Sequence, residues 1–244
     1  MLAAAAASGA EEPKERLSEL FTRGAAQQEA TRVGEGIFQV SGIGNAYRVL
    51  TSEGSVIVDT GLGVEAKRHH ALLLAVGDAP VRALVLTHAH ADHVGGASLW
   101  LGPGVEVITS RAFVARNRDQ LRLDPFRSRR ARVLWAAVMD ERAIAQAPPY
   151  PAVEPDRLVD DRYRFTLGGL SFEVLATPGG EGPDGLSLWL PERRALFTGD
   201  LLGPTTASFP NLFTLRGENL REAMPIVESL DRLLALEPPP TQPR

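Results

Sequence analysis

The sequence predicts a layered α/β/β/α domain. Short β-branched runs gather in two halves of the chain, and each half also contains segments with helical spacing of apolar residues. A proline-rich stretch at 147–155 separates the halves. The chain has 244 residues, of which 44% are hydrophobic, enough to form a packed core. Two sheets packed face to face with helices outside satisfy this pattern.

The first half is expected to begin with antiparallel strands and then to alternate strands with helices. Glycine, asparagine and serine separate the first three β-branched runs, as expected for tight connections. The later segments change to helical periodicity between buried strands. The predicted strands are 36–40, 46–50, 55–59, 83–87 and 105–109, and the predicted helices are 64–76 and 94–101.

The second half is expected to repeat the strand pattern after a helical segment at 111–146. Pro125 is predicted to split that segment into two helices. The expected strands are 163–167, 170–176, 186–191 and 194–199, followed by a helix at 218–236. Pro225 must kink this helix or lie in its first turns. Residues 1–34 are assigned to a helical or disordered extension, 35–236 to the domain, and 237–244 to a disordered tail.

Composition limits the partners and ligands of the chain. The net charge of −4 gives no general attraction for nucleic acid or an anionic membrane surface, so neither is expected as a partner. No run of eighteen apolar residues and no basic signal-peptide start is present, which predicts a cytoplasmic protein. The chain has no cysteine, so a bound metal would need nitrogen and oxygen ligands. A homodimer is left open.

The heptapeptide THAHADH, residues 87–93, contains three of the five histidines. His88 and His90 alternate in an extended loop and can point the same way. Asp92 and His93 lie at the start of the next predicted helix and can face a second ion. Imidazole and carboxylate ligands suit zinc. An ordinary hydrogen-bonded surface or core histidine is the alternative, and it fits His69 and His70 better than the cluster.

Two motifs carry a resemblance to a known family. The segments SVIVDTG (55–61) and LVLTHAHADHVGG (84–96) resemble the metallo-β-lactamase superfamily of binuclear metallohydrolases, over residues 36–236. The resemblance implies an αββα sandwich with a zinc site at its rim, here lacking the last strand and helix. It also implies that Asp59 orients a liganding imidazole from behind. Zinc is favoured over iron, because the diiron relatives carry glutamate where His90 stands.

The second half is similar to the alkylsulfatase branch of that superfamily. Many members have a histidine after TPG, but Gly180 occupies that position here and Glu181 follows it. In the alkylsulfatases a glutamate ligand stands there, with a second acid nineteen residues later, which corresponds to Asp200. The segment PNLFTLRGENLREA (210–223) resembles the part of those enzymes that anchors the sulfate, through Asn211 and Arg216. Arg216 could instead pair near the start of the following helix.

The resemblance implies a hydrolase that uses a zinc-bound hydroxide on a small anionic ester, an alkyl sulfate above all, with Asp92 as a catalytic residue as well as a ligand. The superfamily completes its second metal with a late histidine, whereas no histidine follows His93 here. The family resemblance therefore implies two zinc ions, or only one if the second ion cannot bind without the late histidine. A catalytically impaired homologue acting as a metal-binding or interaction module is the alternative, as is a hydrolase of thioesters or lactones.

Nine arginines lie between Arg111 and Arg142. They could steer an anionic substrate, or they could form a solvated face paired with acids elsewhere. Three aromatic residues of the same segment could line a pocket for an alkyl tail, but they are better explained by packing of the helices on the sheet. These residues are Phe113, Phe126 and Trp135. Trp100 and Trp189 are expected in the core.

Overall fold

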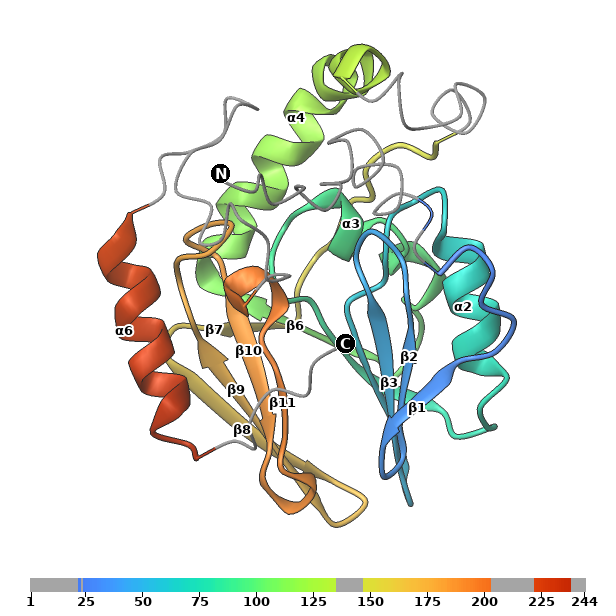
Figure 1. Ribbon diagram of the computed structural model, residues 1–244, viewed down its shortest axis with the longest axis vertical. Helices are drawn as coiled ribbons and strands as arrows, with labels where there is room; N and C mark the ends of the chain where they lie inside the picture. Colours follow the sequence, from blue (N-terminus) through green and yellow to red (C-terminus); the bar gives the residue numbers. More distant parts are fainter. Residues whose placement is uncertain (1–21, 23, 135–146, 203–221, 238–244) are drawn as a thin grey trace, which may run out of the picture.

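The computed structural model describes residues 22, 24–134, 147–202 and 222–237. Within these ranges the chain forms two β-sheets that face one another, with helices on the outer sides (Figure 1). The layered α/β/β/α architecture predicted from the sequence is confirmed.

The first sheet contains the strands of the first half, followed by one short strand after the proline-rich stretch, in chain order. The strands β1 to β4 pair antiparallel, whereas β4 to β7 pair parallel. Parallel neighbours end at the same edge of a sheet, so the segments that follow β4 and β5 emerge side by side. The strands are β1 (Thr31–Gly34), β2 (Ile37–Val40), β3 (Ala46–Thr51), β4 (Gly54–Val58), β5 (Val81–Val85), β6 (Glu106–Ser110) and β7 (Arg157–Val159).

The second sheet is an antiparallel meander with the order β11-β10-β9-β8. Every residue of β10 is buried, since this strand lies inside the sheet and is covered on both faces. Because alternate strands of a meander run in the same direction, β9 and β11 end at one edge. The strands are β8 (Arg162–Leu167), β9 (Leu170–Ala176), β10 (Leu186–Leu190) and β11 (Ala195–Phe197).

Three apolar clusters hold the layers together. The largest lies between the sheets and joins residues such as Val56 and Val85 of the first sheet to Phe172 and Leu188 of the second. A second cluster packs α2 (Ala66–Leu74) and the start of α4 (Arg111–Leu134) on the outer face of the first sheet. A third packs α6 (Ala223–Leu234) on the second sheet, as Figure 1 shows. Trp100 and Trp189 belong to these clusters, as expected.

Two strands of the first sheet were not expected from the sequence. Thr31–Gly34 form β1, which pairs with β2, so the residues assigned to an N-terminal extension end with an edge strand of the sheet. Arg157–Val159 form β7, which pairs with β6. Both strands are short and lie at the sheet edges. Segments of three or four residues give too little alternation to be recognised by pattern alone.

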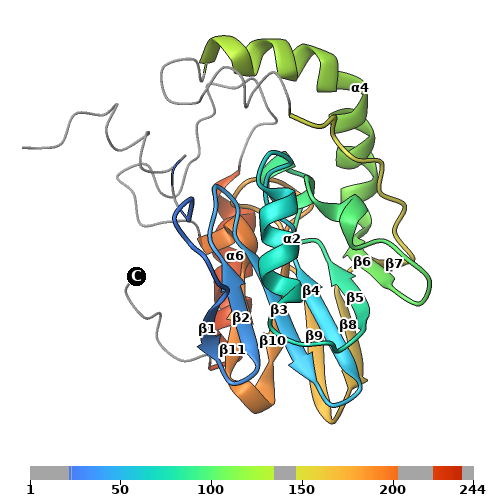
Figure 2. The same ribbon diagram turned by 90° about the vertical axis from the view of Figure 1, so that its right-hand side faces the viewer.

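The helical segments also differ from the prediction. The helix α4 runs unbroken from Arg111 to Leu134 with Pro125 inside it, so the expected split is wrong. Figure 2 shows that this helix bends sharply, because proline removes a backbone donor and crowds the preceding turn without necessarily ending the helix. Pro225 lies in the first turn of α6, which is one of the two expected arrangements.

The helix expected at 94–101 is instead two short turns, α3 (Ala91–Val94) and η1 (Ala97–Leu99). Gly95 and Gly96 separate them and lie against the segment that follows β4. A Cβ atom at Gly95 would stand 2.3 Å from the backbone nitrogen of Gly63. Gly96 also donates its N–H to Thr60 Oγ1 at 3.0 Å. Close approach of two loops, and not helix propensity, fixes the backbone here. The remaining short helical turns are η2 (Pro191–Arg193) and η3 (Gly199–Leu202).

A buried arginine joins α2 to the first sheet. Arg48 on β3 is only 1% exposed, and its guanidinium donates to Leu73 O at 2.8 Å and to Gly77 O at 2.9 Å, at the end of α2. Its Nε donates to Ser55 Oγ on β4 at 3.1 Å. A cation at a helix C-terminus also compensates the helix dipole. Within the described residues, no helix is long and apolar enough to cross a bilayer.

Candidate metal centre

The predicted site residues come together where four strands end. Asp59 follows β4, and residues 87–93 follow β5. From the second sheet, the loop after β9 carries Glu181 and the turn after β11 carries Asp200. A backbone hydrogen bond from Leu186 N to Thr87 O, 2.8 Å long, joins the two sheets at this edge. Segments from both halves of the chain therefore meet at one rim.

The three histidines of the loop are packed against one another and buried. His88, His90 and His93 are 3%, 7% and 5% exposed. The ring centroids of His88 and His90 are 4.6 Å apart, and those of His88 and His93 are 4.2 Å apart. His88 Nε2 lies 3.0 Å from His90 Nδ1. His88 and His90 belong to one group of ligand atoms and His93 to another, and imidazole nitrogens suit a borderline divalent metal.

Asp59 fixes the orientation of His93 from behind. Its Oδ2 lies 2.7 Å from His93 Nδ1, so this nitrogen carries the proton and Nε2 is directed towards the centre. The same carboxylate accepts Thr87 N at 2.8 Å and Thr87 Oγ1 at 2.8 Å. Asp59 is 3% exposed and has a φ of 54°, in the left-handed region that costs a non-glycine residue energy. The backbone is held there by these bonds.

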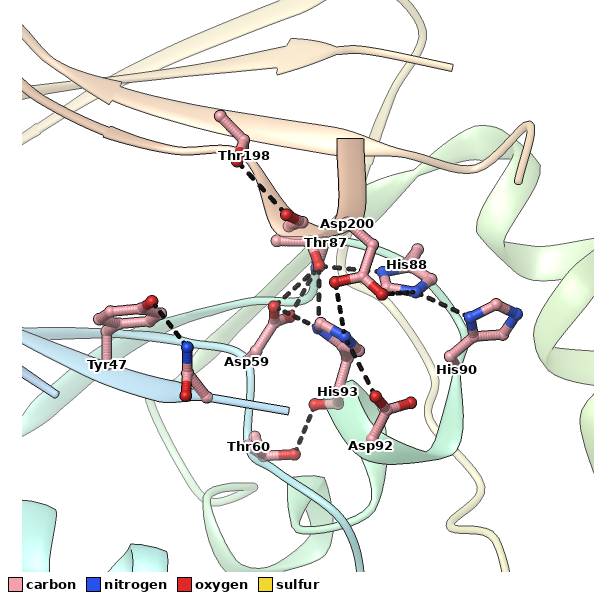
Figure 3. A network of polar contacts seen from close by, with 12 residues as sticks. Tyr47, Asp59, Thr60, Thr87, His88, His90, Asp92, His93, Thr198 and Asp200 are labelled. Atoms are coloured by element: carbon pink, nitrogen blue, oxygen red, sulfur yellow. Dashed lines mark hydrogen bonds and ion pairs between the residues drawn. The ribbon is translucent and has the colours of Figure 1, made fainter. Parts of the chain in front are cut away.

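Asp200 lies between the histidines on the side of the second sheet, as Figure 3 shows. Its Oδ1 is 3.3 Å from His93 Nε2, and its Oδ2 is 3.9 Å from His88 Nε2. Two groups of ligand atoms, each with all distances below 4.8 Å, share this carboxylate; they are His88, His90 and Asp200, and Asp92, His93 and Asp200. The donors can therefore hold one divalent ion in each group, with Asp200 between them.

Glu181 lies beside the first group. Its Oε2 is 3.6 Å from His90 Nδ1, and its side chain is 16% exposed. It is not within the mutual 4.8 Å of either group of ligand atoms found among the described residues. The structure thus brings Glu181 to the rim of the centre, beside His90.

The charges of the centre are strongly coupled. Burial acts to lower the pKa of His93, but the carboxylates of Asp200, Asp59 and Asp92 outweigh it and raise that pKa well above its usual value. Burial raises the pKa of Asp200, but His93 above all holds it below the usual range. Burial and the two neighbouring histidines lower the pKa of His88 well below normal. A divalent cation that binds His93 must therefore displace the proton on Nε2, while the proton on Nδ1 stays with Asp59.

The turn that carries Asp200 needs a glycine. Gly199 has a φ of 51°, and a Cβ atom there would stand 2.7 Å from the Thr87 side chain. Because no bulkier residue fits against Thr87, the turn comes close enough for Asp200 to reach the histidines.

Several other predicted residues lie elsewhere. Asn211 and Arg216, expected to bind the substrate, fall outside the described residues, as does Trp135. Phe113 is buried in the core, whereas Phe126 is 53% exposed. His69 is fully buried on the inner face of α2, and His70 packs edge-on against Trp100 at 4.5 Å, so neither belongs to the centre. Most described arginines of α4 are exposed, but Arg116 is only 7% exposed.

Sequence reasoning gave no role to Thr87, the first residue of the histidine motif. Its backbone N–H and its hydroxyl hold Asp59, and its hydroxyl oxygen lies 3.2 Å from His88 Nδ1. The available signal was its position directly before the first histidine, where it continues the strand into the loop.

Comparison with known proteins agrees with this geometry. A family model of the metallo-β-lactamase superfamily matches residues 41–241. The chain belongs to the metallo-β-lactamase superfamily. The family resemblance carried by the motifs at 55–61 and 84–96 is thereby confirmed. The His/Asp cluster described above could hold metal ions, and it lies within the residues that match the metallo-β-lactamase family model.

Curated relatives include a linear primary-alkylsulfatase of Pseudomonas sp. (strain ATCC 19151), which is 28% identical over 76% of this chain and 38% of that protein. A beta-lactamase-like protein 2 homolog of Caenorhabditis elegans is 31% identical over 82% of this chain and 56% of that protein. The chain thus spans about two fifths to a little over half the length of these metallo-β-lactamase relatives.

Among solved structures, the stereoselective inverting sec-alkylsulfatase of Pseudomonas sp. superposes with a TM-score of 0.73 at 22% identity. The match covers 91% of this chain and 38% of the sulfatase. A metallo-beta-lactamase from Pontibacter korlensis superposes with a TM-score of 0.58 at 22% identity, over 87% of this chain and 86% of that one. At these identities the likeness supports the metallo-β-lactamase fold alone.

Proposed function

We propose that this chain hydrolyses a small anionic ester with a binuclear zinc centre, and that the ester is an alkyl sulfate. The observation that carries the proposal is the pair of ligand groups that share Asp200. His88, His90 and Asp200 would hold one ion, with Glu181 able to join them, and Asp92, His93 and Asp200 would hold the other. Bound zinc supplies Lewis-acid charge and lowers the pKa of a coordinated water towards about 7.

The protein groups around the centre support hydrolysis. A cavity of about 10 Å³, lined by Thr87, His88, Glu181 and Asp200 among others, has room for about one water molecule. Asp92 keeps 27% of its side chain exposed and lies 3.6 Å from His93 Nε2. It is therefore placed both to bind a cation and to accept a proton from water that enters from solvent.

The choice of a sulfate ester rests on the alkylsulfatases among the relatives, and on Glu181, which directly follows Gly180 at the position where many superfamily members have a histidine. A centre that holds two divalent cations favours a substrate whose leaving group and ester oxygens are anionic. The partner that follows from this chemistry is a small-molecule ester.

The test uses the purified full chain. Metal content is measured by elemental analysis, and hydrolysis is then followed with an alkyl sulfate, a phosphate ester, a thioester and a lactone. Two zinc equivalents per chain and preferential turnover of the alkyl sulfate are expected. Turnover of only the thioester or lactone would reject the sulfate ester, and less than one equivalent without any turnover would reject the enzyme.

His70→Ala provides a matched histidine control for His88→Ala. His70 is a partly buried histidine on α2 outside the centre, so its replacement should leave metal content unchanged. His88→Ala removes a buried ligand and should lose both bound zinc and hydrolysis. Equal metal content in the two variants would contradict the assigned centre.

A further inference from the structure

Ala89 separates the two alternating histidines of the loop, and both of its backbone polar groups are bound by side chains from distant segments. Its N–H donates to Asp184 Oδ2 at 2.8 Å, and its carbonyl accepts the hydroxyl of Tyr150 at 3.1 Å. Ala89 is 1% exposed, so neither group can turn to solvent instead. Loss of either side chain would leave a buried backbone group without its partner.

These two bonds restrain the part of the backbone that sets the histidine geometry. The N–H of Ala89 belongs to the peptide shared with His88, and its carbonyl belongs to the peptide shared with His90. Fixing both peptide planes fixes φ and ψ of Ala89. The angle between the side chains of His88 and His90 follows from these two dihedral angles, so the bonds act on the ligands without touching a metal.

Asp184 is itself held rigidly. It is 2% exposed, and its backbone carbonyl accepts Ser110 Oγ at 2.8 Å. The Ser110 hydroxyl also accepts the N–H of Phe113 at 3.1 Å, which caps the start of α4. The Nε of Arg116 on α4 lies 3.9 Å from Asp184 Oδ1 and places a buried cation beside the carboxylate. The carboxylate is therefore fixed by the beginning of α4.

Tyr150 is suited to donate its hydroxyl hydrogen bond to Ala89 O at all pH values near neutral. It is 9% exposed. Burial, and then the nearby Asp184, raise the pKa of its hydroxyl above the usual value, so the phenol keeps its proton at neutral pH. It comes from the segment before β7, whereas Asp184 comes from the loop between β9 and β10. Ala89 is thus held from two independent directions.

The same arrangement ties the two ligand loops to each other. Asp184 lies three residues after Glu181, in one loop. The bond to Ala89 therefore sets the distance between the loop of Glu181 and the loop of His88 and His90.

We propose that Asp184 and Tyr150 are positioning residues, which clamp Ala89 and so hold His88 and His90 in the geometry that binds a divalent metal. The clamp rests on the proposed function, because it serves a metal centre. Asp184 and Tyr150 act through the peptide of Ala89 and are not ligands.

The experiment measures zinc affinity by competition with a chelator, and the visible spectrum of the cobalt-substituted full chain, at a temperature where circular dichroism shows each metal-free variant to be folded. Asp184→Ala should weaken zinc binding by ~10–100-fold, the usual effect of removing a group that orients a ligand, and should alter the cobalt spectrum. Asp184→Asn keeps an oxygen that accepts the Ala89 N–H and should restore affinity to within about threefold. Tyr150→Phe should lie between them.

Asp156→Ala is the matched control. Asp156 Oδ2 accepts a backbone N–H, that of Val107, at the same 2.8 Å, but it lies at the beginning of β6 and β7, opposite the end where the ligands gather. It should change thermal stability without changing zinc affinity or the cobalt spectrum.

The outcomes separate the clamp from the proposed function. If Asp184→Ala lowers thermal stability yet binds zinc with the affinity and cobalt spectrum of the unsubstituted chain, the clamp is wrong and the hydrolase assignment stands. If the unsubstituted chain binds neither zinc nor cobalt, the proposed function is wrong and the clamp falls with it. Failure of Asp184→Asn to restore affinity would also reject the clamp.

Discussion

The two sides of the metal centre are built differently. On the side of the first sheet, His88 and His93 are almost fully buried; Asp59 Oδ2 lies 2.7 Å from His93 Nδ1, and Thr87 Oγ1 lies 3.2 Å from His88 Nδ1. On the side of the second sheet, Asp200 keeps 32% of its side chain exposed and follows a positive-φ glycine turn. The histidine side is thus preformed, while the acidic side is more open. Ligand geometry is set by the first, and access for water and substrate by the second.

The largest expected effect comes from Asp200, because both ligand groups share its carboxylate. Asp200→Ala should abolish measurable hydrolysis and reduce bound zinc, an effect larger than the ~100-fold upper range for groups that only orient ligands. Elemental analysis and steady-state rates measure it. Glu181→Ala should do less, since Glu181 lies beside His90 but belongs to neither group of ligand atoms. A weaker effect at Asp200 than at Glu181 would reverse the assignment of the bridging acid.

The next effect tests how much Arg48, which joins α2 to the first sheet, stabilises the fold that carries the histidine side. Arg48→Met leaves the carbonyls at the end of α2 and Ser55 without their buried donor, and should reduce the free energy of unfolding by about 1–3 kcal/mol for each acceptor left unpaired. Urea denaturation measures this change. Arg157→Met removes an exposed pairing with Glu106 and should cost below about 1 kcal/mol. Similar losses in the two variants would show that burial of Arg48 adds nothing.

Asp59 provides a test of the preformed geometry itself. Asp59→Ala removes the acceptor of His93 Nδ1 and of both Thr87 donors, and should weaken zinc binding by ~10–100-fold. Thr87→Val removes only one of these bonds and should have a smaller effect. Chelator competition measures both affinities. If Asp59→Ala binds zinc as tightly as the unsubstituted chain, the histidine side does not need this acid.

The smallest effect is a change of stability with pH, which arises from the buried His69 on α2. Burial, and then Arg68, lower the pKa of His69 to about 4, so the folded state prefers the neutral ring. Between this pKa and the usual value of ~6.5, the unfolded chain binds more protons, and stability therefore falls as pH decreases through that window. The contribution lost between pH 7 and 5 should be about 2 kcal/mol.

The variant His69→Gln should remove this part of the pH dependence, as measured by urea denaturation at pH 7 and 5. His70→Gln is the control, because His70 is less buried than its neighbour. An unchanged difference between the two pH values in His69→Gln would show that other groups cause the loss.

The histidine side was also the part that sequence could predict. His88, His90, Asp92 and His93 lie within one short motif, so their proximity requires no knowledge of the fold. The placement of Asp59, Glu181 and Asp200 came only from the family resemblance, because these residues lie in other loops. The sheets and most helices could be predicted from periodicity.

What the sequence could not reveal depends on contacts between distant segments. Asp184 binds a peptide 95 residues earlier in the chain, and an isolated aspartate in a glycine-rich loop gives no sign of this. Arg48 looks like a strand residue at a solvent-facing position until α2 packs over it. The helix α4 continues beyond Pro125, although proline is expected to end or split a helix.

The positive φ of Asp59 has a further consequence. A backbone φ of 54° costs glycine less energy than it costs aspartate, yet glycine has no carboxylate to hold His93. The chain therefore accepts conformational strain at a position chosen for its chemistry. Selection for a more stable fold and selection for a well-ordered metal site would favour different amino acids at this residue, a conflict common where activity and stability compete.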